Sequence, residues 1–159
     1  QECIDLIGKK QFYGDNIVIN VDIPDGIGDI YADRVYFQQV LHNMIMNAYH
    51  AIDKNGTITF RAYEKGTRKI VLEIEDTGSG IDPQHIEKIW EPFFTTKPTN
   101  ALPGQKATGS GLGLALVKRY IEGNGGTLDV KSLVNKGTTF YLTMVKVTKG
   151  KNNEQSTDS

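Results

Sequence analysis

The stretch LEIEDTGSGIDP, residues 72–83, determines how the rest of the sequence is interpreted. It closes an alternating strand pattern with an acid, Asp76, and then supplies Gly78 and Gly80. Side chains in a strand alternate between two faces, so Asp76 shares its face with the apolar residues of the strand. A carboxylate in that position either caps the glycine turn that follows or lies at the mouth of a cavity that another group fills.

Length, composition and charge limit the class of protein to which this chain can belong. The chain has 159 residues, 38% of them hydrophobic and 23% charged, which is typical of one globular domain. A net charge of -1 gives no electrostatic reason to expect nucleic acid or an acidic membrane as a partner. The single cysteine, the absence of a membrane-spanning run and the absence of a signal peptide predict a cytoplasmic protein. The abrupt start, QECIDLIGKK, predicts a piece of a longer chain.

Helical and strand patterns alternate along the chain without a repeat. Strands are predicted at 16–24, 57–64, 68–76, 127–132 and 138–147, with the last four forming two hairpins. Helices are predicted at 1–10, 35–52, 83–89 and 111–122, with a loop at 91–108 and a disordered tail at 149–159. The sequence therefore predicts an α+β fold over 1–148, a two-layer sandwich. Its mixed, mostly antiparallel sheet of about five strands is covered on one face by about three helices.

The helix predicted at 35–52 carries a polar cluster beside its apolar face. Asn43, Asn47 and His50 are spaced by four and then three residues, so they stack along one side of the helix. Amide oxygens at the edge of a buried face can ligate Mg²⁺, which prefers oxygen and keeps waters or substrate phosphates as further ligands. A polar flank facing solvent explains the same residues, so both interpretations stay open.

A second glycine-rich stretch, TGSGLGLALV, occupies residues 108–117. Gly109, Gly111 and Gly113 open an amphipathic helix, which uncovers backbone N–H groups where the helix dipole favours an anion. The spacing matches neither a Walker A loop nor a Rossmann motif. A glycine-rich linker is the alternative, although linkers do not usually continue into a leucine-rich helix.

Five motifs in a fixed order make these signals specific. NMIMNAYHA, DTGSGI, WEPFFTTK, GSGLGLALV and GTTF together resemble the ATP-binding catalytic domain of sensor histidine kinases. This family belongs to the GHKL superfamily, shared with gyrase and heat-shock chaperone ATPases, and the resemblance covers residues 4–147. It implies a two-component protein-histidine kinase domain that binds ATP and Mg²⁺ and transfers the γ-phosphoryl group to a histidine.

The resemblance implies roles for residues at the phosphate end of such a site. Asn47 would bind Mg²⁺, Asn43 would support the metal and the phosphates, and His50 would lie near the phosphates and make that contact depend on pH. Residues 97–108 would form a lid over the nucleotide. Lys97 and Lys106 are the lid cations best placed to meet the γ-phosphate, and the sequence does not select between them.

At the adenine end, the resemblance implies that Asp76 accepts a hydrogen bond from the adenine amino group. Gly78 and Gly80 would let the backbone come close, Ile81 would pack on the base, and Thr138 would bond toward the same site. Phe93 and Phe94 would anchor the lid. The other residues implied in ATP binding are Thr95, Thr96, Gly109, Ser110, Gly111, Leu112, Gly113 and Leu114.

The sequence contains no evident phosphoacceptor. None of its histidines, His42, His50 and His85, is followed by the acidic residue that the family's acceptor motif carries. The resemblance therefore implies an acceptor histidine on a dimerisation domain absent from this chain, in the same full-length protein or in another. A response regulator would be an indirect partner, and the chain could equally be the cytoplasmic portion of a membrane-bound sensor.

Three other functions are compatible with the superfamily. ATPases of the gyrase, chaperone or mismatch-repair type carry an acid one helical turn before the metal asparagine, where this chain has Asn43. Anti-sigma-type protein-serine kinases share the fold, but the WEPFFTTK motif and the long proline-containing lid favour the histidine-kinase branch. A module that senses nucleotide without catalysis is disfavoured by intact glycine motifs and by Asn47.

Overall fold

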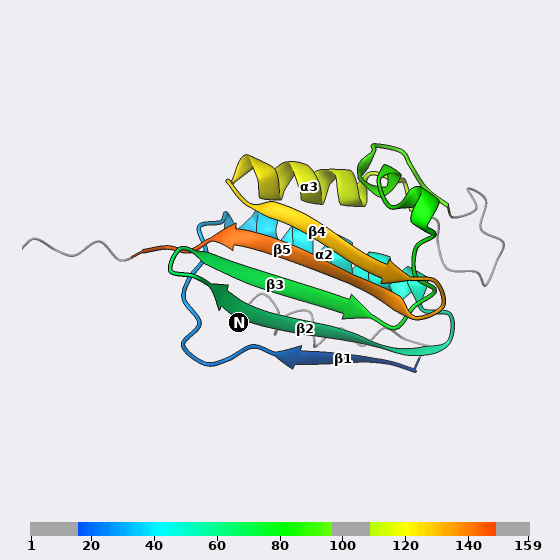
Figure 1. Ribbon diagram of the computed structural model, residues 1–159, viewed down its shortest axis with the longest axis horizontal. Coiled ribbons are helices and arrows are strands. Elements are labelled where there is room, and N and C mark those ends of the chain that lie inside the picture. Colours follow the sequence, from blue (N-terminus) through cyan, green and yellow to red (C-terminus); the bar gives the residue numbers. More distant parts are fainter. Residues whose placement is uncertain (1–15, 97–108, 149–159) are drawn as a thin grey trace, which may run out of the picture.

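The computed structural model describes residues 16–96 and 109–148 of the chain. Five strands in these ranges form one mixed sheet in the order β1-β2-β3-β5-β4 (Figure 1). β1 and β2 are parallel, and the other neighbouring strands are antiparallel. The predicted strands and both hairpins are confirmed. The strands are β1 (Asn16–Asp22), β2 (Asn55–Lys65), β3 (Lys69–Asp76), β4 (Thr127–Leu133) and β5 (Gly137–Val145).

Two α-helices, α2 (Arg34–Ala51) and α3 (Gly113–Gly123), cover one face of this sheet (Figure 1). The Asp33 carboxylate caps α2 by accepting hydrogen bonds from the backbone N–H groups of Val35 at 2.9 Å and Tyr36 at 3.1 Å. The helix predicted at 35–52 is therefore confirmed. α3 begins two residues later than predicted, because Gly111 has a φ of +71° and cannot belong to a right-handed helix.

The short helix predicted at 83–89 is wrong in detail. The structure has two 3-10 turns there, η1 (Pro83–His85) and η2 (Lys88–Trp90). Asp82 caps the first by accepting a hydrogen bond from the N–H of Gln84 at 3.0 Å. So short a segment gains too few hydrogen bonds to nucleate an α-helix. The helix predicted at 1–10, the lid at 97–108 and the tail at 149–159 lie outside the described residues.

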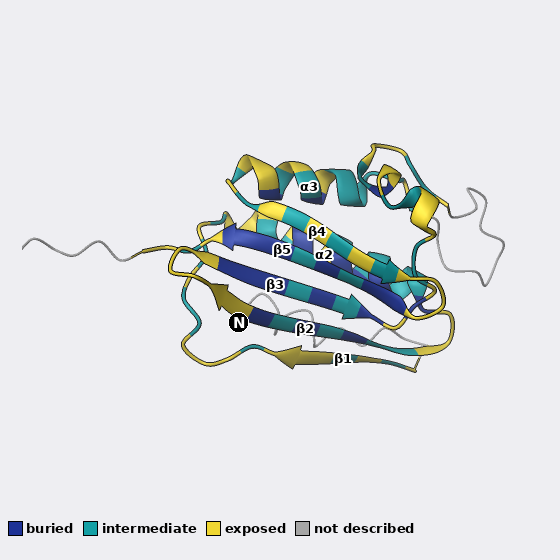
Figure 2. Ribbon diagram, in the orientation of Figure 1, coloured by how far each residue is buried: buried dark blue, intermediate teal, exposed yellow. Residues whose placement is uncertain are grey.

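The core lies between the helices and the inner face of the sheet. Figure 2 shows the central strands β3 and β5 largely buried and the edge strand β1 largely exposed. The apolar face predicted for α2 is confirmed, because its central residues are buried and its end residues Phe37 and Ala51 are half-buried. The buried residues of that face are Val40, Leu41, Met44, Ile45, Ala48 and Ile52.

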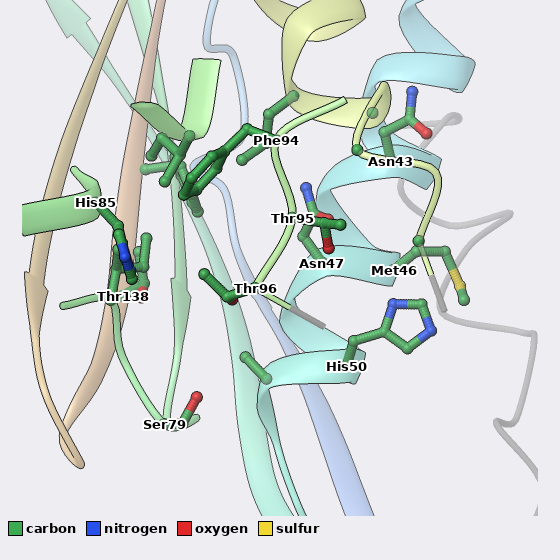
Figure 3. A pocket seen from close by; sticks show the side chains of 18 of the residues that line it. Asn43, Met46, Asn47, His50, Ser79, His85, Phe94, Thr95, Thr96 and Thr138 are labelled. Carbon is green, nitrogen blue, oxygen red and sulfur yellow. The ribbon is translucent and has the colours of Figure 1, made fainter. Parts of the chain in front are cut away.

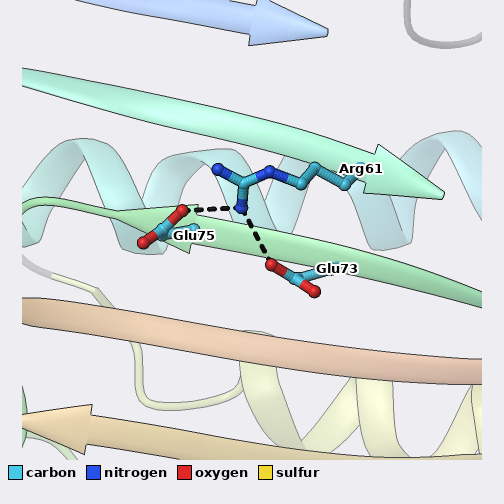
Figure 4. A network of polar contacts seen from close by, with 3 residues as sticks. All are labelled: Arg61, Glu73 and Glu75. Carbon is cyan, nitrogen blue, oxygen red and sulfur yellow. Dashed lines mark hydrogen bonds and ion pairs between the residues drawn. The ribbon is translucent and has the colours of Figure 1, made fainter. Parts of the chain in front are cut away.

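The outer face of the sheet is polar near its centre. Arg61 on β2 donates hydrogen bonds from one guanidinium nitrogen to Glu73 at 2.8 Å and to Glu75 at 2.7 Å, both on β3 (Figure 4). The side chain of Arg61 is 39% exposed, so solvent screens these ion pairs. They help to hold the register of two neighbouring strands and leave most of the stability to the apolar inner face.

Glycines allow the β4–β5 turn to approach the loop that follows β3. A Cβ at Gly137 would overlap the carbonyl oxygen of Asp76, and a Cβ at Gly80 would overlap the carbonyl oxygen of Leu133. Between these two contacts, the N–H of Asn135 donates to the carbonyl of Ser79 at 2.7 Å. The two segments therefore pack backbone against backbone.

We predict that Gly137→Ala destabilises the fold far more than Gly66→Ala. Both glycines have a positive φ, at +121° and +65°, but a Cβ at Gly66 has open space around it. Gly66→Ala should cost roughly 1–2 kcal/mol from backbone strain alone. Gly137→Ala should cost more than about 3 kcal/mol, because strain and overlap add. Urea unfolding measures both costs, and equal values would contradict the proposed close approach.

Candidate functional site

A cavity of about 600 Å³ lies between α2, the loop after β3 and the start of α3. Figure 3 shows Asn43, Asn47 and His50 projecting from α2 on one side, with Phe94, His85 and Thr138 on the other. Most of the predicted site residues meet here. Those lining the cavity are Asn43, Asn47, His50, Asp76, Gly80, Ile81, Phe94, Thr95, Thr96, Gly109, Ser110, Gly111, Gly113, Leu114 and Thr138.

Four predicted site residues are not among those that line the cavity. Gly78 and Leu112 are each next in sequence to a lining residue but do not line the cavity. Lys97 and Lys106 fall outside the described residues, so their roles stay predictions. The structure thus groups the predicted residues of α2, of the loop after β3 and of the start of α3 around one space.

Asp76 is a buried carboxylate at one end of the cavity, with 4% of its surface exposed. Its Oδ1 accepts a hydrogen bond from the N–H of Gly78 at 2.8 Å, and the N–H of Thr138 also donates to this carboxylate. Burial nevertheless raises the pKa of the Asp76 carboxyl to about 6, because desolvation of the charge outweighs both hydrogen bonds. Asp76 therefore caps the glycine turn and also lines a cavity.

Asn47 has an unsatisfied polar atom in the same cavity. Its side-chain nitrogen is buried and has no hydrogen-bond partner within residues 16–96 and 109–148. Turning the amide by 180° would exchange its nitrogen and oxygen, so one polar end lacks a protein partner in either orientation. A buried amide left unpaired is costly, and this position therefore fits a ligand or a metal ion.

The start of α3 offers uncapped backbone N–H groups to the cavity. No side chain caps the helix at Leu112, and Gly109 has open space around it. A Cβ at Gly111 would lie 2.6 Å from the backbone of Phe93, whose N–H donates to the carbonyl of Gly111 at 3.0 Å. An anion would find both free donors and the positive end of the helix dipole here.

The two phenylalanines predicted to anchor the lid behave differently. Phe94 lines the cavity and packs against the core, with its ring centroid 5.5 Å from that of His85. The side chain of Phe93 is 73% exposed, and Phe93 is held through its backbone at a φ of +66°. The side chain of Phe94 is therefore packed and that of Phe93 is not, while the anchoring of the lid stays a prediction.

The glycines of the DTGSGI motif make room for the protein's own backbone. A Cβ at Gly78 would lie 2.7 Å from backbone atoms of Ala51, at the end of α2, and a Cβ at Gly80 would overlap Leu133. The N–H of Ser79 donates to the carbonyl of Ala51 at 2.9 Å between these two positions. Both glycines are thus required by packing, whatever the cavity binds.

Several residues that line the cavity are missing from the sequence prediction. Phe140 could have been found, because it is two residues after Thr138 on β5 and faces the same side. His85 carries no periodic signal, since it ends the short 3-10 turn η1. The lining residues that were missed are Met46, Ala51, Ser79, Asp82, His85, Ile89 and Phe140.

The arrangement defines a class of site. A buried hydrogen-bond acceptor at one end and an uncapped helix start at the other suit a nucleotide, which has a base at one end and phosphates at the other. The family model of histidine kinase-, DNA gyrase B- and HSP90-like ATPases matches residues 32–148. The chain belongs to this family, and it is a catalytic ATP-binding domain of the sensor histidine kinase type.

Individual relatives agree with this assignment. The sensor histidine kinase ZraS of Salmonella typhi is 44% identical over 113 residues, which are 71% of this chain and 22% of the relative. The catalytic domain of histidine kinase ThkA is 30% identical, with a TM-score of 0.68 over 82% of this chain and 81% of that one. ThkA in complex with the response regulator protein TrrA is 27% identical, with a TM-score of 0.65 over 83% and 35%.

The chain spans 22% of the length of ZraS, so it corresponds to one part of such a relative. In the described part of the chain, neither helix has the length and hydropathy needed to cross a membrane.

We predict that Asp76 makes stability depend on pH. The folded state holds the Asp76 proton more tightly than the unfolded chain does, because the pKa rises from 3.8 to about 6. The contribution of Asp76 to the free energy of unfolding is therefore fully present below pH 4 and is lost as the pH rises through 6. Relative to Asp76→Asn, the wild type should lose on the order of 3 kcal/mol between pH 4 and pH 7.

Urea unfolding of both proteins at several pH values measures this loss. Asp129→Asn, which removes an exposed carboxylate from β4, is the matched control. A constant difference between wild type and Asp76→Asn across the range would show that the carboxylate is not desolvated.

Proposed function

We propose that this domain transfers the γ-phosphoryl group of ATP to a histidine on a dimerisation domain absent from this chain. The observation that carries the proposal is the placement of Asp76 and Asn47 in one cavity, the first as a buried acceptor and the second with a buried side-chain nitrogen that lacks a partner. The similarity to sensor histidine kinases supports a phosphotransfer reaction on this site.

At the base end, Asp76 would accept a hydrogen bond from the adenine amino group. The carboxylate already holds two backbone N–H groups, and its remaining acceptor capacity is available to the cavity. Ile81 and Phe140 supply apolar surface beside it. A planar base therefore has a polar edge contact and apolar packing at the same end.

At the phosphate end, Asn47 would hold Mg²⁺ together with the phosphates. The described residues contain no group of three or more His, Cys, Asp or Glu side chains placed to hold a metal ion, so the protein would provide few of the ligands there. This suits Mg²⁺, which commonly takes one or two protein ligands and completes its shell with waters and phosphates. When bound, Mg²⁺ neutralises phosphate charge as the γ-phosphoryl group leaves.

The remaining residues at this end would position the phosphates. Asn43 lines the cavity from α2 and faces Gly113, whose Cβ would lie 3.5 Å from the Asn43 side-chain oxygen. His50 lies one turn beyond Asn47. The uncapped N–H groups of α3 would supply further donors to phosphate oxygens.

ATP hydrolysis is the competing reaction, and the cavity disfavours it. Asn43 occupies the position from which an acid would activate water, and an amide cannot take a proton near neutral pH. The carboxylates lining the cavity within the described residues, Asp76 and Asp82, both come from the end of β3 and the loop after it. Helix α2 therefore brings no carboxylate to the phosphate end.

A response regulator is the proposed downstream partner. The solved complex of ThkA with TrrA shows a histidine kinase bound to a response regulator. By analogy, the phosphohistidine formed with this domain would pass its phosphoryl group to such a protein.

We predict that Asn47→Ala removes most of the Mg²⁺ dependence of ATP binding. Without the amide, Mg²⁺ loses its protein ligand and would bind with the phosphates alone, so the affinity gained by adding Mg²⁺ should fall about tenfold. Calorimetry with and without Mg²⁺ measures the gain. Gln39→Ala removes an exposed amide from the same helix and should keep the wild-type dependence. A full Mg²⁺ effect in Asn47→Ala would refute the metal role.

We predict that the domain labels a histidine in trans. Mixed with dimerisation domains of sensor histidine kinases and ATP labelled on the γ-phosphate, it should give a phosphoprotein that is labile in acid and stable in alkali. Asp76→Asn should give little label at an ATP concentration that saturates the wild type. An acid-stable product would indicate serine or threonine transfer, and free phosphate without protein label would indicate an ATPase.

A further inference from the structure

Ser132 on β4 lies behind the cavity wall and contacts three groups that shape the base end. The backbone N–H of Ile81 donates to its hydroxyl oxygen at 2.8 Å. The same hydroxyl donates to the carbonyl of Gly137 at 3.0 Å, and it lies 2.9 Å from the hydroxyl oxygen of Thr138. Ser132 itself is not among the lining residues, whereas Ile81 and Thr138 are.

These contacts fix the direction of the hydrogen bond between the two hydroxyls. A serine hydroxyl has one proton to donate and two lone pairs to accept with. A carbonyl can only accept, so the Ser132 proton goes to Gly137. Ser132 then accepts from Ile81 and from Thr138, and the Thr138 proton is thereby committed to Ser132. The Thr138 oxygen is left with lone pairs only.

Two buried polar side chains of the described residues line the cavity, Asp76 and Thr138. With the Thr138 proton committed to Ser132, the hydroxyl is an acceptor, and the ionised Asp76 carboxylate is an acceptor as well. A purine with an amino group at position 6 offers two N–H donors to such a surface. A purine with a 6-oxo group would place a hydrogen-bond acceptor against the Asp76 carboxylate and the Thr138 oxygen, which are acceptors themselves. Binding of such a purine is therefore disfavoured.

We propose that Ser132 is a positioning residue that fixes the Thr138 hydroxyl as an acceptor and thereby favours 6-amino over 6-oxo purine nucleotides. This inference rests on the proposed adenine site. Its new content is that the Ser132 hydroxyl, which does not line the cavity, contributes to the choice of base. It does so because its only proton goes to the Gly137 carbonyl, which leaves it to accept the proton of Thr138.

The test compares ATP with inosine triphosphate, which replaces the 6-amino group of ATP by a 6-oxo group. In Ser132→Ala the Thr138 hydroxyl is released and can turn its proton toward a 6-oxo group. The ratio of the inosine triphosphate Kd to the ATP Kd should therefore fall by about fivefold, the effect of one net hydrogen bond. Ser132→Cys, of similar size but with a weak thiol acceptor, should lower the ratio in the same direction.

Two matched variants separate the proposed effect of Ser132 on base selection from a general disturbance of the structure. Ser132→Thr keeps the hydroxyl and should keep the wild-type ratio. Thr127→Ala removes an exposed hydroxyl from the same strand and should leave both affinities unchanged. Calorimetric titration in excess Mg²⁺ gives all the constants, and circular dichroism confirms that each variant is folded.

The outcomes distinguish this inference from the proposed site. If Ser132→Ala and Ser132→Cys weaken both nucleotides equally and leave the ratio unchanged, Ser132 has only a structural role and the inference is wrong. If the wild type binds ATP and inosine triphosphate equally, the proposal that Asp76 binds adenine is wrong, and the inference about Ser132 is wrong with it. A ratio that falls in both variants and is retained in Ser132→Thr supports the inference.

Discussion

The burial of the Asp76 carboxylate at the end of the central strand is the constraint on which the site depends. Removing this charge from water is unfavourable, and two backbone N–H groups offset the cost only in part. Those donors exist because the loop after β3 turns sharply at Gly78 and because β5 begins beside Asp76. The carboxylate thus dictates the local path of two backbone segments, and these segments form the base end of the cavity.

Most of the fold could be predicted from the sequence because it depends on periodicity. Strand alternation placed Asp76 on the inner face, and helical spacing brought Asn43, Asn47 and His50 to one side of α2. The failures come where backbone conformation departs from a regular period. Gly111 at positive φ delays the start of α3, and the segment after Pro83 divides into two 3-10 turns.

Residues of the site could be predicted only where they belong to a recognisable sequence motif. Glycine motifs marked the correct segments, but no pattern shows that Gly78 makes room for Ala51 or Gly80 for Leu133. Ser132 illustrates the same limit, since its contacts depend on how the β4–β5 hairpin meets the loop after β3. Contacts between segments distant in sequence follow from strand order and register, which local patterns do not specify.

The parallel pairing of β1 with β2 makes α2 a crossover helix (Figure 1), and this has a consequence for folding. The β2–β3 and β4–β5 hairpins can form by closing short turns, whereas β1 and α2 require a much longer loop to close. The cavity therefore exists only after both hairpins and the crossover have joined. A nucleotide that contacts all three pieces binds the assembled state alone, and so it shifts the folding equilibrium toward that state as its concentration rises.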